Sequence, residues 1–112
     1  MNDIYRLSML LDFYGELLTR NQLDILNEYV NDDLTISEIA SNRGISRQGV
    51  HEVVKRSEAI LEEYEKKLGL INKFISIKLD IKELLTIIEE LDINNSFRNE
   101  IMLKVQGILE KL

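Results

Sequence analysis

Cysteine, proline and tryptophan are absent from this 112-residue sequence, and histidine occurs once, as His51. Without cysteine the chain can form neither disulfides nor thiolate metal sites. A zinc site would need carboxylates for nearly every ligand, so we expect no metal and no cofactor. No apolar run approaches the roughly 20 residues that span a bilayer, so we expect no membrane insertion. The first residues also lack the features of a signal peptide, and we predict a cytoplasmic location.

An excess of basic residues is missing as well, because the net charge is −6. Overall basicity is the usual mark of a nucleic-acid-binding protein. Any affinity for nucleic acid must therefore come from a local patch. Hydrophobic residues make up 45% of the chain, which is typical of a folded globular domain and excludes wholesale disorder.

Apolar residues recur at steps of three and four along most of the chain, and the alternation typical of strands is missing. This pattern predicts an all-α protein of six helices. The first helix is expected over about 3–18, the fourth over 47–68, and a break between helices falls in the region 69–81. Capping boxes at Thr19–Gln22 and Thr35–Glu38 predict two helix starts. Ser46 and Ser96 are the expected caps of two later helices.

Residues 36–55 have the spacing of a helix-turn-helix motif. Gly44 can adopt the positive φ that the tight turn requires. Ala40, four residues earlier, supplies the small side chain that the crossing of the two helices needs. Apolar residues are expected on the inner face: Ile39, Ile45, Val50 and Val53.

The second helix of the motif, over 47–56, is the candidate recognition helix. Over 43–56 four basic residues face one acidic residue, Glu52, which gives a local charge of +3. Arg and Gln near a helix N-terminus can contact guanine and adenine edges, and the amides after Ser46 can bind a phosphate. Arg43 occupies a position that is usually apolar, and we expect its stem to cover the core while its guanidinium reaches water. The candidate nucleic-acid-binding residues are Arg43, Ser46, Arg47, Gln48, His51, Lys55 and Arg56. The alternative is a solvated helix face without a ligand.

No catalytic residues are proposed. His51 has no nucleophile or carboxylate at a spacing that implies a catalytic pair. The adjacent pairs Glu62–Glu63 and Glu89–Glu90 point about 100° apart on a helix and are expected to be solvated. The tyrosines fall on or near apolar stripes and are expected in the core: Tyr5, Tyr14, Tyr29 and Tyr64. We therefore predict a non-enzymatic protein.

A helix over 47–68 would be about 33 Å long, at 1.5 Å per residue. Its distal apolar residues need cover from the C-terminal helices or from a second chain: Ile60, Leu61, Tyr64 and Leu68. We accordingly divide the chain into a helix-turn-helix domain, 1–68, and a C-terminal helical extension, 69–112. The extension is a possible homodimerisation element, and the alternative is a monomer in which it folds back.

Several blocks of sequence resemble the YlxM family of small bacterial helix-turn-helix proteins. They are Leu11–Tyr14, Leu17–Thr19 with Gln22, Asp33–Ala40, Ile45–Val50, Lys55–Arg56 and Tyr64–Glu65. The blocks occur in order between about residues 5 and 75. The helix-turn-helix part alone is also similar to region four of sigma factors, which binds promoter DNA.

The resemblance implies a regulatory or accessory protein of the signal recognition particle pathway. The implied partner is the RNA of the particle or its GTPase. The same helix could instead serve a DNA-binding transcriptional regulator, and a third hypothesis is a protein–protein module in which the motif is only a scaffold. The family has no catalytic residue to carry over, whereas Ser46–Gln48 and Lys55–Arg56 match as residues facing nucleic acid.

Overall fold

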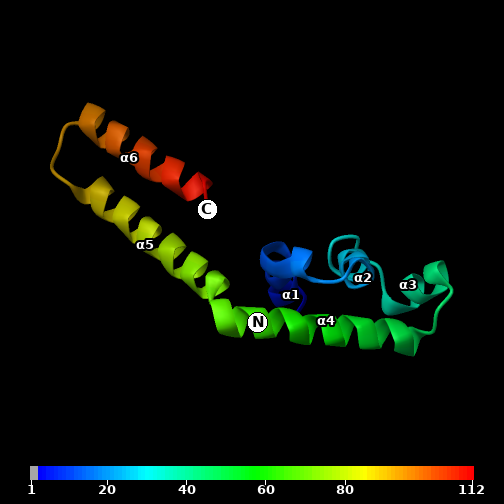
Figure 1. The fold of residues 1–112 in the computed structure, drawn as a ribbon. Coiled ribbons are helices and arrows are strands. Elements are labelled where there is room, and N and C mark those ends of the chain that lie inside the picture. Colours follow the sequence, from blue (N-terminus) through cyan, green and yellow to red (C-terminus); the bar gives the residue numbers. More distant parts are fainter. Residues whose placement is uncertain (1–2) are drawn as a thin grey trace. The chain divides into compact units, whose positions relative to one another are not determined.

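The computed structural model describes residues 3–112, and every regular element in that range is a helix (Figure 1). The all-α prediction is therefore confirmed. The elements are α1 (Asp3–Tyr14), the 3-10 helix η1 (Gly15–Leu17), α2 (Arg20–Val30), α3 (Ile36–Arg43), α4 (Arg47–Leu68), α5 (Leu70–Glu90) and α6 (Asn95–Glu110). The expected domain 1–68 includes Met1 and Asn2, which lie outside the described residues.

Contacts within the chain define two compact units, Met1–Ile71 and Asn72–Leu112. The expected division after residue 68 lies three residues before this boundary. The first unit contains the helix-turn-helix, and the second is a hairpin of α6 with most of α5. Among the described helices, none combines the length and the hydrophobicity that a membrane-spanning segment requires.

Local signals in the sequence locate most helix starts. Thr19 and Thr35 each accept a hydrogen bond from the amide three residues later, and the side chain of that residue bonds back to the threonine amide. Ser46 caps α4 as expected. The prediction for Ser96 is wrong, because Asn94 caps α6 by accepting a hydrogen bond from the amide of Phe97 at 2.8 Å. Asparagine is as good an N-cap as serine, so the earlier residue takes the role.

Two helix boundaries differ from, or refine, those expected from the sequence. The first α-helix ends at Tyr14, and η1 follows it over Gly15–Leu17. Gly15 packs tightly there, since a Cβ would lie 3.1 Å from a methyl carbon of Leu11. The break expected within 69–81 lies at its start, because Gly69 has φ 64° and α5 then runs without interruption from Leu70 to Glu90.

The core of the first unit lies between α4 and the helices α1–α3. Its buried residues are Leu7, Leu10, Leu11, Tyr14, Leu18, Ile25, Leu26, Ile39, Ala40, Val50, Val54, Leu61 and Ile71. The sequence predicts that Leu61 needs cover from the C-terminal helices or a second chain. Instead α1 covers this part of α4, and the rings of Tyr14 and Tyr64 stack with centroids 6.1 Å apart. Tyr5, also expected in the core, is 61% exposed because it lies on the outer side of α1.

Candidate nucleic-acid interface

The turn between α3 and α4 is built from backbone hydrogen bonds around Gly44. Gly44 has φ 66°, in the left-handed region that favours glycine. The amide of Ile45 donates to the carbonyl of Ala40 at 3.1 Å, which closes the end of α3. Ser46 then accepts a hydrogen bond from the amide of Gly49 at 3.0 Å and begins α4. The tight corner predicted from the sequence is therefore present.

Small and apolar side chains behind this turn fix the angle between the two helices. Ala40 and Ile39 of α3 are buried against Val50 and Val54 of α4. The prediction for Ile45 is wrong, because it is 45% exposed. It lies in the turn itself, where only its amide bonds to α3.

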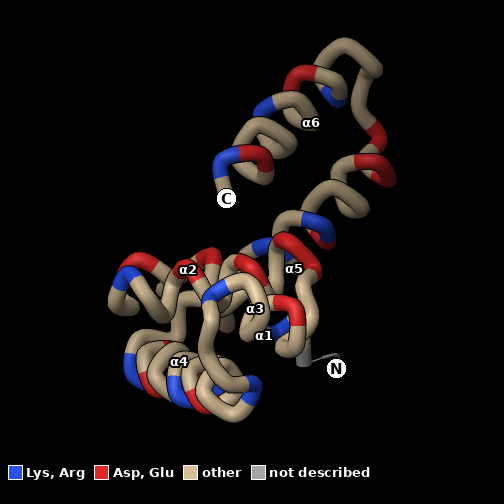
Figure 2. The backbone as a smooth tube through the Cα atoms, turned by 90° about the vertical axis from the view of Figure 1, so that its right-hand side faces the viewer, with Lys and Arg blue, Asp and Glu red and all other residues tan. Residues whose placement is uncertain are grey.

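The first turns of α4 expose their polar side chains. Arg47, Gln48, His51, Lys55 and Arg56 are all exposed. Within the described part of the chain, none of these five side chains forms an ion pair or a hydrogen bond. Figure 2 shows the basic positions along α4 interspersed with acidic ones. The expected residues thus come together on one free surface.

Arg43 behaves differently from the other candidates. Its guanidinium donates from Nε to Glu28 Oε2 at 2.9 Å and forms a second bond to the same oxygen. Its side chain is only 30% exposed, and Glu28 comes from α2. The guanidinium expected to reach water is therefore paired, and its charge is offset. Arg47, Lys55 and Arg56 remain as the unpaired cations of this segment, against Glu52.

A hollow lies on each side of the exposed stretch of α4. One, of about 250 Å³, is lined by His51 and Lys55 together with residues of α1, α2 and α3. The other, of about 260 Å³, is lined by Glu52 and Arg56 together with Thr19 at the start of α2. The exposed stretch of α4 therefore forms a ridge between the two hollows.

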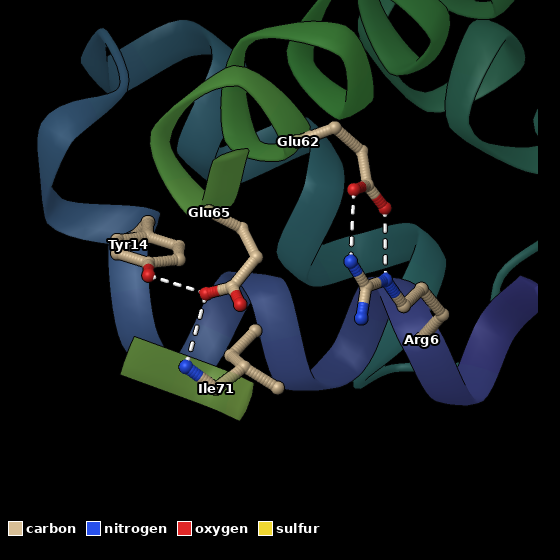
Figure 3. Close-up of polar contacts among 5 residues, drawn as sticks. All are labelled: Arg6, Tyr14, Glu62, Glu65 and Ile71. Atoms are coloured by element: carbon tan, nitrogen blue, oxygen red, sulfur yellow. Dashed lines mark hydrogen bonds and ion pairs between the residues drawn. The ribbon is translucent and has the colours of Figure 1, made fainter. Parts of the chain in front are cut away.

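Two polar contacts brace the distal half of α4 against α1 (Figure 3). Arg6 donates from Nε and from Nη2 to the two carboxylate oxygens of Glu62, each at 2.9 Å. These hydrogen bonds hold the pKa of Glu62 below its usual value and raise that of Arg6. One member of the pair Glu62–Glu63 is thus an ion-pair partner of α1, whereas both were expected to be solvated.

The second contact centres on the buried carboxylate of Glu65. It accepts from the hydroxyl of Tyr14 at 2.6 Å and from the amide of Ile71 at 2.9 Å. The Tyr14 oxygen in turn accepts from the amide of Leu70 at 3.2 Å. Burial first, and then the bond to Glu65, raise the pKa of Tyr14. Glu65 and Tyr14 therefore bind the first amides of α5 and fix where that helix begins.

Sequence reasoning missed this site, although a signal exists. Glu65 lies four residues after Leu61, on the buried stripe of α4, where an acidic residue needs a partner. Tyr14 lies on the buried stripe of α1 and carries a hydroxyl that needs one too. The pattern indicates that each of these residues needs a buried polar partner, but it does not identify one as the partner of the other.

Comparison with known proteins places this architecture in a family. The family UPF0122, described as "Putative helix-turn-helix protein, YlxM / p13 like", matches residues 1–105. A UPF0122 protein of Acetivibrio thermocellus is 45% identical over 95 residues, covering 85% of this chain and 81% of the relative. One from Desulforamulus reducens is 34% identical over 112 residues, covering 100% of this chain and 94% of the relative. One from Bacillus cereus is 41% identical over 107 residues, covering 96% of this chain and 94% of the relative. The chain therefore belongs to the UPF0122 family of YlxM/p13-like helix-turn-helix proteins.

Proposed function

We propose that this protein is a non-enzymatic regulatory or accessory component of the signal recognition particle pathway, and that it contacts the RNA of the particle through the first turns of α4. The observation that carries the proposal is the free, exposed set Arg47, Gln48, His51, Lys55 and Arg56. Ser46 adds a capped helix start, whose amides favour a phosphate. The pathway itself is implied by the resemblance to the YlxM family.

The charge balance favours an RNA contact of limited electrostatic strength. Three unpaired cations, Arg47, Lys55 and Arg56, can each neutralise one phosphate. The logarithm of the binding constant should then fall with the logarithm of the salt concentration, with a slope of about −2 to −3. Each neutralised phosphate contributes roughly 0.7–0.9 to that slope. The major groove of an RNA helix is too narrow for side-chain readout, so the contact would be at a loop or through shape.

A DNA-binding transcriptional regulator is the second candidate function. The observation favouring it is the exposure of polar side chains on the N-terminal part of α4, since an α-helix with such side chains fits a major groove. In that case Arg47 and Gln48 would contact base edges, and binding would depend on base sequence.

The deciding experiment is a pull-down from native cells with and without nuclease, followed by titration of the purified chain with the recovered RNA or DNA. Recovery of the particle's RNA supports the first function, and enrichment of a defined promoter fragment supports the second. Arg47→Ala with Gln48→Ala should weaken binding by roughly 1–3 kcal/mol for each base that these side chains recognise. Lys66→Ala, which removes a charge at an exposed position near the other end of the same helix, is the matched control. Equal affinity of the double variant and the control would remove the nucleic-acid proposal and favour a protein–protein module.

A further inference from the structure

We propose that the hairpin of α5 and α6 is a homodimerisation surface, and that two copies of the chain pair through it as a four-helix bundle. The inference does not depend on nucleic-acid binding. It rests on the exposed apolar face of this hairpin and on the small core that the hairpin has by itself.

The core of the second unit is small for its length. Three residues are buried, Ile81, Ile88 and Val105, with four apolar neighbours partly buried around them. The unit Asn72–Leu112 is about 40 residues long, near the size at which a fold usually needs disulfides, metals or oligomerisation. The chain has no cysteine, and no metal-binding cluster occurs among its described residues. A second chain packed on the hairpin would add buried apolar area that this small core lacks by itself.

Large apolar side chains remain exposed on one face of the hairpin. On α5, Ile77, Leu84 and Leu91 recur every seven residues, next to the buried stripe of Ile81 and Ile88. At about 100° per residue they lie on the same flank of that stripe. Because α5 and α6 are antiparallel neighbours, the matching flank of α6 lies on the same side. The seven residues of this apolar face are each 41–57% exposed: Ile77, Leu84, Ile87, Leu91, Phe97, Ile108 and Leu112.

The opposite side of the hairpin is more polar, although it also exposes Ile75, Leu79 and Leu103. Lys78, Lys82 and Glu89 lie on its α5 side, and Asn99 and Gln106 on its α6 side. Seven of the ten large exposed apolar residues of Asn72–Leu112 lie on one face, where the charged residues Asp80 and Lys104 lie among them. This asymmetry is typical of a helix pair that buries one face in a bundle.

The size of the apolar face suits a second copy. A 16-residue helix is about 24 Å long and a helix pair about 20 Å wide, which gives on the order of 500 Å² in projection. The accessible area exceeds this projected area because the side chains make the surface uneven. It therefore approaches the roughly 800 Å² that each partner buries in a standard interface. A second hairpin offers an apolar face of equal size, and a two-fold axis would pair the two faces.

The test is the mass of the full-length chain by light scattering, from low to high micromolar concentration. We expect twice the monomer mass of 13.1 kDa. Leu84→Glu with Ile87→Glu should halve that mass. Leu103→Glu, on the opposite side of α6 and 69% exposed, is the matched control and should leave the dimer intact. A wild type that stays monomeric, or a dimer that survives the double substitution, would overturn the proposal.

A second measurement does not require a charged residue on the apolar face. The chain is free of cysteine, so Leu84→Cys and Leu103→Cys each create a single thiol. We expect maleimide to label the thiol at position 84 more slowly as protein concentration rises, whereas labelling at 103 stays constant. A concentration-independent rate at position 84 would mean that the face is covered within one chain or left open, which also rejects the proposal.

Discussion

Tyr14→Phe is the sharpest test of how α4 is held in place. The substitution keeps the aromatic ring, which is 2% exposed and stacked on Tyr64, and removes only the hydroxyl. The hydroxyl donates to the buried carboxylate of Glu65 and accepts from the amide of Leu70. A hydrogen bond to a charged group contributes about 1.5–3 kcal/mol. We therefore expect the free energy of unfolding to fall by about 2 kcal/mol.

The assay is thermal and urea unfolding followed by circular dichroism at neutral pH. For a domain of 60–100 residues, 2 kcal/mol lowers Tm by about 8–16 °C. Tyr64→Phe is the matched control, because Tyr64 stacks on the same ring and no hydrogen bond of its hydroxyl occurs among the described residues. A decrease within about 0.5 kcal/mol for Tyr14→Phe, the range of an ordinary surface change, would refute the role given to its hydroxyl.

The contribution of the Tyr14 hydroxyl to stability can also be measured at alkaline pH. The pKa of Tyr14 is raised in the folded protein above its ordinary value of 10.0. The folded state therefore holds the hydroxyl proton more tightly than the unfolded chain does. The stabilisation that the Tyr14 hydroxyl provides is complete below pH 10. It is lost as pH rises through the folded pKa. The stability difference between the wild type and Tyr14→Phe should accordingly narrow above pH 10, and a constant difference would contradict this account.

Three further predictions concern single positions. Gly44→Ala should lower the free energy of unfolding by about 1–2 kcal/mol, as measured by urea unfolding. The added Cβ meets no atom within 4 Å, so the penalty comes only from the positive φ. Gly107→Ala lies inside α6 with open space around it and should stabilise that helix by up to about 1 kcal/mol, seen as increased helicity and Tm. Glu62 has a lowered pKa, so its ion pair with Arg6 stabilises above pH 4.5 and is lost as pH falls through the folded pKa. The Glu62 side chain is 42% exposed, which limits the effect to at most about 1 kcal/mol, and Glu62→Gln should remove this part of the acid dependence of Tm.

Local chemistry explains why so much of the fold was predictable. The capping boxes at Thr19 and Thr35 and the cap at Ser46 each involve residues within three positions, so the sequence contains the whole interaction. The turn at Gly44 depends on the φ preference of one residue. Such features do not depend on tertiary packing. The candidate interface follows from them, because the start of α4 decides which side chains face outward.

Contacts between distant residues were not predictable in the same way. Arg43 pairs with Glu28 from another helix, and Tyr14 with Glu65 from 51 positions along the chain. Spacing identifies the face of a helix on which a residue lies, but not the charge that a neighbouring helix brings to it. For that reason the sequence groups Arg43 with the free cations, although packing gives it a partner.

The pairing of Arg43 changes what the proposed interface can do. With Glu28 offsetting that charge, Arg47, Lys55 and Arg56 remain as the unpaired cations of residues 43–56, on a protein whose net charge is −6. Attraction to phosphates at any position is then weak, and it weakens further with salt. If the proposed contact with nucleic acid holds, its affinity would come from contacts to a particular shape or set of bases, through side chains such as Gln48. The contacts of Glu62 with Arg6 and of Glu65 with Tyr14 would support this mode of binding, because a helix already fixed in place loses little conformational freedom when it meets a partner. A few specific contacts on a rigid helix would thus achieve what a broad basic surface achieves in less selective proteins.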